Sequence, residues 1–255
     1  MEENKLIQQS SIIQQDGWSS LRSFTAARIA LGRTGVSIPI KENLQFRLAH
    51  AYARDAVYAC LSTEMLLSEL DKNRWNHICL NSECANRNEY LQRPDKGRKL
   101  NSQSREQLCK HNNECYDIAI IAADGLSAIA INEHFIPLVK ILIPFLKDKF
   151  SIAPITLVEK ARVAIADEVG SLLKAQMSIV FIGERPGLTS PNSMGAYITY
   201  NPTVGLTDER RNCVSNIRPE GLPYLEAVEK IMYLVTTAFQ LKLSGVALKD
   251  ETLLC

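Results

Sequence analysis

The clearest candidate chemistry lies in a short polar loop that follows an apolar run. Residues 177–182 read Met-Ser-Ile-Val-Phe-Ile and lead directly into Gly183-Glu-Arg-Pro-Gly187. This order predicts a buried strand that ends in a stiff loop, and open α/β sheets bind ligands at such strand ends. The Glu184 carboxylate could accept hydrogen bonds from amide or hydroxyl groups of a ligand. The alternative is a surface ion pair with Arg185 or Arg211, which the residues alone favour slightly.

Two other predicted strands end in loops that should reach the same edge of the sheet. Residues 116–123 form an apolar run (Tyr-Asp-Ile-Ala-Ile-Ile-Ala-Ala), and Asp124 follows it directly. Residues 154–158 predict a second strand, and Val163 lies in the loop beyond it. Because the carboxyl ends of parallel strands meet at one edge, these loops should lie near Glu184. Taken alone, Val163 would be interpreted as a core residue.

Cysteine offers a second kind of chemistry, and the chain has seven cysteines at irregular spacing. Cys213, within the polar run 207–221, predicts by itself a buried structural thiol. A separate group could hold zinc and comprises six residues: His77, Cys79, Cys84, Cys109, His111 and Cys115. No Cys-x2-Cys pair is present, although structural zinc sites usually need that close spacing. The sequence therefore favours partly buried thiols in a connecting region, and we predict no metal site.

Several strong catalytic and cofactor motifs are absent from the sequence. It has no Gly-x-Gly-x-x-Gly, no Walker A loop, no His-Glu-x-x-His pair and no Gly-x-Ser-x-Gly elbow. A self-sufficient enzyme usually shows a nucleophile with its base, or a metal constellation. We therefore assign no catalytic residue to this chain. The pattern favours a protein that works with a partner or holds a cofactor.

The overall composition excludes several classes of partner. The 255 residues are 46% hydrophobic and 22% charged, with a formal net charge of +1. A near-neutral balance gives no electrostatic reason to expect nucleic acid or an anionic membrane. No apolar run approaches the roughly 20 residues that span a bilayer. The first residues also lack the basic region and apolar core of a secretory signal, so we expect a cytoplasmic protein with reduced thiols.

Helical patterns dominate the first part of the chain. Apolar side chains recur at helical spacing over about 18–31 and over about 42–70. Residues 71–115 are polar and predict an irregular segment. We therefore predict a helical N-terminal region over residues 1–115.

Strands and helices alternate in the rest of the chain. Apolar strand patterns are separated by helical patterns over about 126–149 and 166–176, and a closing amphipathic helix is expected over 220–243. Such alternation predicts an α/β fold with a doubly wound sheet and right-handed crossovers. The predicted α/β domain covers residues 116–255.

Long and compositionally unusual motifs occur between Trp18 and Asp250. They include Phe24-Thr-Ala-Ala-Arg-Ile-Ala-Leu-Gly-Arg33, Ala123-Asp-Gly-Leu-Ser-Ala128, Ala161-Arg-Val-Ala164, the loop 183–187 and Arg211-Asn-Cys-Val-Ser-Asn-Ile-Arg-Pro-Glu-Gly221. Together they resemble the small (light) subunit of adenosylcobalamin-dependent ethanolamine ammonia-lyase. The stretch 75–84, rich in cysteine and histidine, departs from the family pattern.

The resemblance implies an activity, a partner and a fold. Enzymes of this family convert ethanolamine to acetaldehyde and ammonia by radical chemistry, and their large subunit, a TIM barrel, holds the substrate. The small subunit is a Rossmann-like domain preceded by helices, and it helps enclose the corrinoid at the interface between the subunits. The chain alone is then expected to be inactive. N-terminal arms address some members to a bacterial microcompartment.

The resemblance also implies a set of cofactor contacts. By motif, the family's cobalamin contacts fall here on Val163, Glu184 and Cys213. The chain has no Asp-x-His-x-x-Gly, the motif that replaces the cofactor's own base by histidine in other cobalamin enzymes. The cofactor is therefore expected to keep its own base on cobalt.

Two interpretations from other classes remain open. The chain could be a stand-alone α/β protein that binds a small molecule or regulates another protein. It could also be a metal-dependent enzyme that uses the group of cysteines and histidines around residues 77–115. A neighbouring gene for a TIM-barrel subunit would favour the subunit interpretation. Metal analysis of the purified chain would decide whether it is a metal-dependent enzyme.

Overall fold

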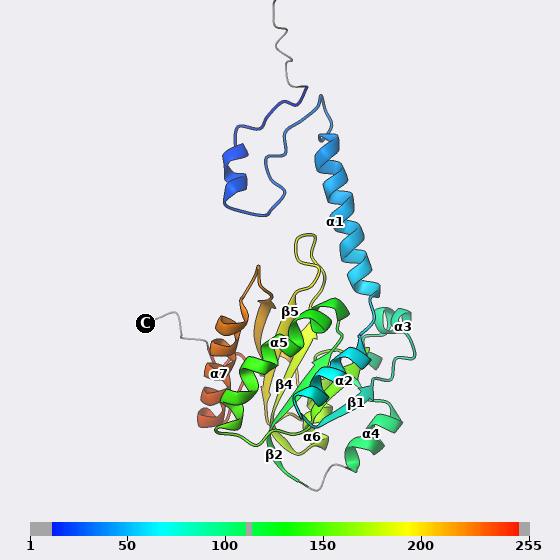
Figure 1. The fold of residues 1–255 in the computed structure, drawn as a ribbon, viewed down its shortest axis with the longest axis vertical. Coiled ribbons are helices and arrows are strands. Elements are labelled where there is room, and N and C mark those ends of the chain that lie inside the picture. The colour runs from blue at the N-terminus through cyan, green and yellow to red at the C-terminus, as the bar shows by residue number, and fades with distance from the viewer. Residues whose placement is uncertain (1–11, 111–113, 250–255) are drawn as a thin grey trace, which may run out of the picture. The chain divides into compact units, whose positions relative to one another are not determined.

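The computed structural model describes residues 12–110 and 114–249, which form a mixed α/β protein (Figure 1). These residues divide into two compact units. The smaller unit contains residues 12–53 together with 187–189, and the larger unit contains the remaining described residues. Each unit is described by itself below.

A six-stranded mixed sheet forms the centre of the larger unit. Its strands are β1 (His77–Asn81), β2 (Tyr116–Ala123), β3 (Ile155–Glu159), β4 (Ala175–Gly183), β5 (Met194–Tyr200) and β6 (Asn212–Ile217). They lie in the order β1-β3-β2-β4-β5-β6. The first four in this order are parallel, whereas β5 runs antiparallel to both β4 and β6. The central parallel strands β2, β3 and β4 are largely apolar because both of their faces are covered.

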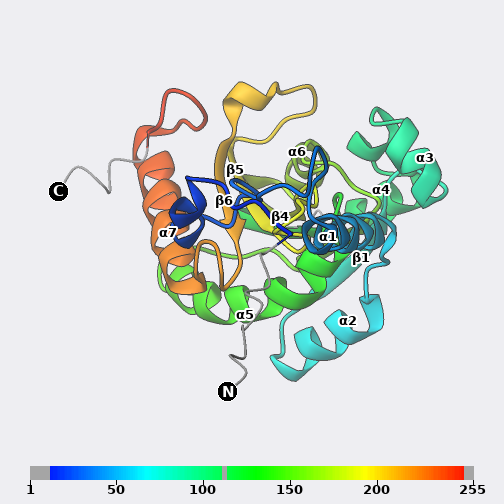
Figure 2. The same cartoon turned by 90° about the horizontal axis from the view of Figure 1, so that it is seen from above.

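Helices cover both faces of the sheet, so that the unit has three layers (Figure 2). One face packs against α2 (Thr63–Lys72), α5 (Ala128–Lys147) and α7 (Tyr224–Leu241). The other face packs against α4 (Ser102–Cys109) and α6 (Ile165–Leu172). The short elements α3 (Arg87–Gln92), η2 (Lys96–Arg98) and η3 (Asp208–Arg210) lie in the connections.

The direction of winding changes between β3 and β2. The chain leaves β2 through α5 to reach β3 on one side, and then returns through α6 to β4 on the other side of β2. The helices α5 and α6 pack on opposite faces of the sheet. The carboxyl ends of β2, β3 and β4 share one edge, which is where ligands bind in sheets of this kind. The loops that contain Asp124, Val163 and Glu184 therefore lie at this edge. The finer Rossmann-like classification stays a prediction.

Helix α5 is a long apolar helix of 20 residues. By length and composition alone it could cross a membrane, and it continues through Pro137 and Pro144. More than half of its apolar window, 56%, is nevertheless buried inside the protein. Its side chains, such as Phe135 and Leu142, belong to the larger core cluster. Such burial is typical of a core helix, and the expectation that no segment approaches the length of a span was wrong.

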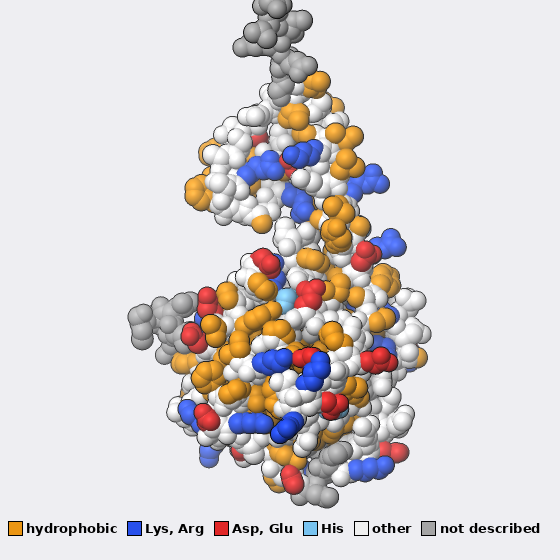
Figure 3. Space-filling view, in the orientation of Figure 1, with side chains coloured by type: hydrophobic (Ala, Val, Ile, Leu, Met, Phe, Trp, Pro, Cys, Tyr) orange, Lys and Arg blue, Asp and Glu red, His pale blue; other side chains and the backbone are white. Residues whose placement is uncertain are grey.

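The smaller unit has almost no core of its own. It contains η1 (Ser19–Ser23) and most of α1 (Ile40–Tyr58), and Pro39 is its one fully buried residue within the described part. Many large apolar side chains are exposed there (Figure 3): Trp18, Phe24, Val36, Ile38, Ile40, Leu44, Leu48 and Tyr52. Exposed apolar surface on this scale is typical of a protein–protein contact.

The single helix predicted over 42–70 is divided into α1 and α2. Asn132 of α5 stabilises the break, because its side chain accepts a hydrogen bond from the amide of Ser62 (2.8 Å) and donates one to the carbonyl of Cys60 (3.1 Å). The spacing of apolar residues carries no sign of this tertiary contact. Near the N-terminus, the helix predicted over 18–31 is reduced to the short turn η1.

The prediction that residues 71–115 are irregular was also wrong. This segment contains β1, α3 and α4, and β1 pairs with β3 in parallel at the edge of the sheet. The side chain of Asn101 caps α4 by accepting a hydrogen bond from the amide of Ser104 (2.8 Å). The strands β5 and β6 were not predicted either. The sheet therefore extends beyond the expected strands on both sides.

Candidate functional site

Glu184 holds together the ends of three strands. Its amide donates a hydrogen bond to the carbonyl of Ser193 (2.9 Å), which lies just before β5. Its carboxylate accepts hydrogen bonds from the Ser193 hydroxyl and from the amide of Asn216 in β6 (3.3 Å to Oε2). Among the described residues, neither Arg185 nor Arg211 forms the ion pair considered as the alternative. The carboxylate is instead half-buried and fixed by neutral donors.

Two glycines leave room for this arrangement. A Cβ atom on Gly195 would lie 2.9 Å from Oε1 of Glu184 and 3.4 Å from the ring of Tyr197. A Cβ atom on Gly183 would lie 2.0 Å from the carbonyl oxygen of Ser127, which a real structure cannot tolerate. Glycine at both positions therefore lets the loop approach β5 and the start of α5 closely.

Cys213 lies beside Glu184 and is exposed, so the expectation of a buried thiol was wrong. It pairs across the strands with Tyr197, and the two side chains are hydrogen-bonded. Desolvation raises the pKa of both Cys213 and Tyr197, and the Glu184 carboxylate raises both further. At neutral pH the pair is therefore uncharged. A carboxylate and two neutral polar groups are thus brought together.

These groups lie on a part of the sheet that no helix covers. Val214 and Ile217 point into the core cluster beneath α7, so Cys213 points to the opposite face. On that face α6 packs over β2 and β4, and within the described residues no helix packs extensively over β5 and β6. Figure 2 shows α6 on the side of the sheet opposite α5. We call Glu184, Tyr197 and Cys213 on this surface the open-face cluster.

Val163 lies on the same face of the sheet as the open-face cluster. It precedes α6 and is partly buried, and it packs against the same core cluster as Tyr197. The structure therefore brings Glu184 and Cys213 together and places Val163 at the helix that borders their surface. Ser193, Tyr197 and Asn216 were missed by the sequence analysis, because their roles depend on two strands that it did not predict.

A buried ion pair fixes the loop that leads into β6. Arg211 and Asp167 of α6 form a salt bridge with both side chains about 2% exposed, and Arg211 also contacts Asp208 (2.9 Å). The Arg211 guanidinium donates a further hydrogen bond to the carbonyl of Leu206 (3.2 Å). Burial raises the pKa of Asp167 to about 6. This pair attaches the 204–211 segment to α6, beside Val163.

Protein groups fill the crevice between β3 and β2. The Asp124 carboxylate accepts hydrogen bonds from the amide of Ala161 (3.0 Å) and from the guanidinium of Arg87 (3.3 Å). The guanidinium carbons of Arg162 and Arg87 lie 4.3 and 4.6 Å from the ring centroid of buried Tyr90. Such stacking favours a structural role. Asp124 was predicted at this edge, whereas sequence spacing could not indicate its partners.

The candidate zinc ligands do not converge within the described residues. Cys84 is buried and Cys79 is half-buried, whereas Cys109 and Cys115 are exposed. His111 lies outside the described residues. No group of three or more histidine, cysteine or acidic side chains in the described part of the chain could hold a metal ion.

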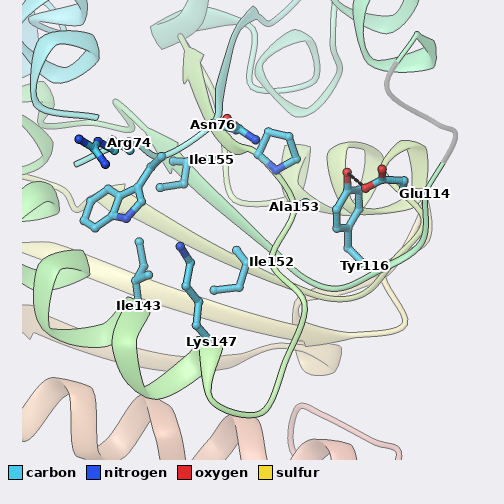
Figure 4. Close-up of a pocket in the computed structure, with 11 residues that line it drawn as sticks. Arg74, Asn76, Glu114, Tyr116, Ile143, Lys147, Ile152, Ala153 and Ile155 are labelled. Atoms are coloured by element: carbon cyan, nitrogen blue, oxygen red, sulfur yellow. Dashed lines mark hydrogen bonds between the residues drawn. The ribbon is translucent and has the colours of Figure 1, made fainter. Parts of the chain in front are cut away.

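A separate cavity of about 250 Å³ opens at the amino ends of β2 and β3, away from the open-face cluster. Its lining includes Ile143, Lys147 and Ile152 (Figure 4), and the Tyr116 hydroxyl there is hydrogen-bonded to Glu114 (2.9 Å). None of the predicted site residues lines it. The opposite edge of the sheet therefore remains the candidate site.

The fold and the site together define an α/β protein with polar groups gathered at strand ends and, among the described residues, without a group of side chains that could hold a metal ion. Comparison with known proteins identifies the family. The model of the ethanolamine ammonia-lyase light chain family matches residues 15–249, and the chain belongs to this family.

Several curated relatives are similar over nearly their whole length. Ethanolamine ammonia-lyase small subunits from Pseudomonas putida (strain W619) and Xanthomonas campestris pv. campestris (strain B100) are each 49% identical to the chain, over 241 and 242 residues. Each alignment covers 93% of this chain and 89% of the relative. The small subunit from Pseudomonas fluorescens (strain Pf0-1) is 49% identical over 93% of the chain and 88% of the relative. Proteins of this family are thus subunits of a lyase, and the name "small subunit" implies a large-subunit partner.

Proposed function

We propose that this chain is the small subunit of an adenosylcobalamin-dependent ethanolamine ammonia-lyase, acting in ethanolamine degradation. In this role it helps to enclose the cobalamin at the interface with a TIM-barrel large subunit. The observation that carries the proposal is the open-face cluster, in which Glu184 and Cys213 meet on an uncovered sheet surface. Membership of the light-chain family supports the same assignment.

The chemistry of the open-face cluster suits the periphery of a corrinoid. Cobalamin carries amide arms around its ring, and a carboxylate such as that of Glu184 accepts hydrogen bonds from amide donors. The neutral Tyr197–Cys213 pair adds polar groups without adding charge. Gly195 keeps the surface above Glu184 free of a side chain. Val163 offers an apolar contact on the same face.

The chain's residues would bind and orient the cofactor rather than react with the substrate. When bound, adenosylcobalamin would supply the radical chemistry that removes ammonia from ethanolamine. Glu184 is fixed by Ser193 and Asn216, so it is preorganised as an acceptor. The surrounding strands would exclude water from one side of the cofactor. No proton transfer is assigned to a residue of this chain.

The smaller unit provides surface for the proposed partner. Its exposed apolar side chains on α1 (Figure 3), including Ile40, Leu44 and Leu48, have no counterpart within the unit to bury them. Burying such side chains against another protein contributes about 25 cal/mol per Å² of apolar surface. A large subunit is the partner that the family name implies. A cytoplasmic location is part of the same proposal.

Reconstitution tests the proposed function. The purified chain alone should not deaminate ethanolamine, whereas the chain with its large subunit and adenosylcobalamin should. The complex should also retain cobalamin through gel filtration, detected by corrin absorbance. Turnover by the isolated chain, or a complex that forms without any affinity for cobalamin, would contradict the proposal. Tight binding of an unrelated small molecule by the isolated chain would favour the stand-alone binding protein.

A further inference from the structure

The cavity at the amino ends of β2 and β3 has the build of a small-molecule site and is separate from the open-face cluster. Its floor is apolar, because Ile143 and Ile155 are buried and Ile152 is partly buried against the core of the larger unit. Figure 4 shows Lys147 reaching from α5 between Ile143 and Ile152, with its amino end directed towards Ile155. The volume of about 250 Å³ is slightly below that of pockets for drug-sized ligands, so it suits a smaller molecule.

The end of α2 supplies one wall of this cavity. Arg74 adopts a left-handed backbone conformation (φ 55°), and its amide donates a hydrogen bond to the carbonyl of Asp71 (2.9 Å). The Trp75 amide donates one to the carbonyl of Leu70 (3.0 Å). This pattern is the Schellman motif, which ends a helix. The turn packs the partly buried Trp75 against the core and leaves Arg74 exposed in the lining of the cavity.

The cavity carries more positive than negative charge. Arg74 and Lys147 both line it, and neither side chain forms an ion pair within the described part of the chain. Glu114 is the one carboxylate in the described lining, and it accepts a hydrogen bond from the Tyr116 hydroxyl (2.9 Å). In Figure 4, Glu114 and Tyr116 lie together on the other side of the cavity from Arg74 and Lys147. Two cations against one carboxylate leave an excess of one positive charge.

We propose that this cavity binds a small monocarboxylic acid, with the carboxylate between Arg74 and Lys147 and the apolar body on the isoleucine floor. An excess of one positive charge matches a monoanion better than a doubly charged phosphate. Guanidinium and ammonium groups form strong hydrogen bonds with a carboxylate. The apolar floor and the Trp75 ring favour a hydrocarbon body over a bare inorganic ion. The site lies at the edge of the sheet opposite the open-face cluster, so it does not rest on the proposed function.

Benzoate and its neutral isostere benzamide are suitable probes, because they share a shape and differ in charge. The chain has two tryptophans, and Trp18 lies in the smaller unit. In the full-length variant Trp18→Phe, indole fluorescence therefore reports on Trp75 alone. Benzoate should change this fluorescence saturably, with a Kd on the order of 1 mM for a ligand of its size. Benzamide should bind at least tenfold more weakly, because it lacks the charge.

Charge-removing variants test which side chains hold the carboxylate. In the Trp18→Phe background, the double variant Arg74→Gln with Lys147→Gln should weaken benzoate binding at least tenfold and change benzamide binding less than twofold. The matched control Arg210→Gln with Lys242→Gln removes the same charge from exposed positions outside the cavity. It should bind benzoate as its parent does. Equilibrium dialysis gives the affinities independently of fluorescence, and unfolding midpoints confirm that all variants are folded.

The contrary results are equally definite. No saturable binding of benzoate, binding that leaves Trp75 fluorescence unchanged, equal binding of benzamide, or an equal loss in the control variant would each overturn the proposal. Displacement of benzoate by inorganic phosphate at similar concentrations would overturn the choice of a monocarboxylate. None of these measurements involves cobalamin or ethanolamine, so the proposed function stands or falls separately.

Discussion

Replacing Glu184 by glutamine should weaken cofactor binding without stopping the chemistry. The variant keeps the shape of the side chain but removes the charge and turns one oxygen into a donor. In the structure, Ser193 and Asn216 already donate to this carboxylate, so one amide oxygen can keep these contacts. The group left to face the open surface would then be an amide nitrogen, which cannot accept hydrogen bonds from the cofactor.

The size of the effect follows from the burial and partners of Glu184. A charge-assisted hydrogen bond contributes about 1.5–3 kcal/mol. Because the carboxylate is half-buried and shared with two internal donors, the lower end of this range applies. Cobalamin affinity should therefore fall roughly tenfold. The weaker internal hydrogen bonds should cost about 1 kcal/mol of unfolding free energy, which lowers the Tm by about 2–4 °C for a domain of this size.

The assay is a cobalamin titration of the complex, read as bound corrin and as turnover. Glu226→Gln is the matched control, because Glu226 is exposed on α7 and has no charged partner within the described residues. That variant should match the wild type in both measurements. In Glu184→Gln the apparent Kd should rise while turnover at saturating cofactor changes little. Unchanged affinity with a collapsed turnover number would refute the reasoning and assign Glu184 to the chemistry.

Three further predictions concern other parts of the molecule. Burial raises the pKa of Asp167 from 3.8 to about 6, so the folded state binds more protons between these values and the unfolding free energy should fall as pH rises from about 4 to 6. In the Asp167→Asn variant the unfolding free energy, measured by denaturation across this pH range, should not fall in this way. An equal fall in the wild type and the variant would contradict the assignment of the effect to Asp167. Replacing Leu44 and Leu48 together by serine should change the unfolding free energy by less than about 0.5 kcal/mol, measured by melting. The same variant should assemble with the large subunit at least tenfold more weakly, measured by sedimentation. The control variant His50→Gln should alter neither quantity. Cys213 should react slowly with iodoacetamide because its pKa is raised, and bound cobalamin should slow it further in peptide mapping; equal labelling with and without cobalamin would argue against its contact.

The central strands could be predicted because they are buried on both faces. The apolar runs that became β2, β3 and β4 need no partner information to be recognised. The outer strands carry a weaker signal. In β6 only Val214 and Ile217 are buried, and the exposed polar residues between them conceal the pattern. For the same reason β1, with alternating burial at the other edge, was interpreted as irregular.

The site was predicted in position but not in detail. A strand followed by a glycine- and proline-rich loop indicated where Glu184 would lie. Its partners could not be predicted, because Ser193 and Asn216 reach it only through the antiparallel extension of the sheet. Cys213 was expected to be buried, since isolated cysteines usually are. It is exposed because the helix layer on that side stops at β4, and no local sequence signal marks where a layer ends.

Helix α5 has a consequence for how the chain can be produced. During synthesis α5 leaves the ribosome before β3 and β4, so its apolar side is open to solvent until those strands arrive. A segment that insertion machinery reads by length and hydrophobicity is then available on a nascent chain. If a secretory signal were fused to this protein, α5 would be a second apolar segment that the insertion machinery could retain in the bilayer. Folding onto the sheet buries the same residues in the core of the larger unit.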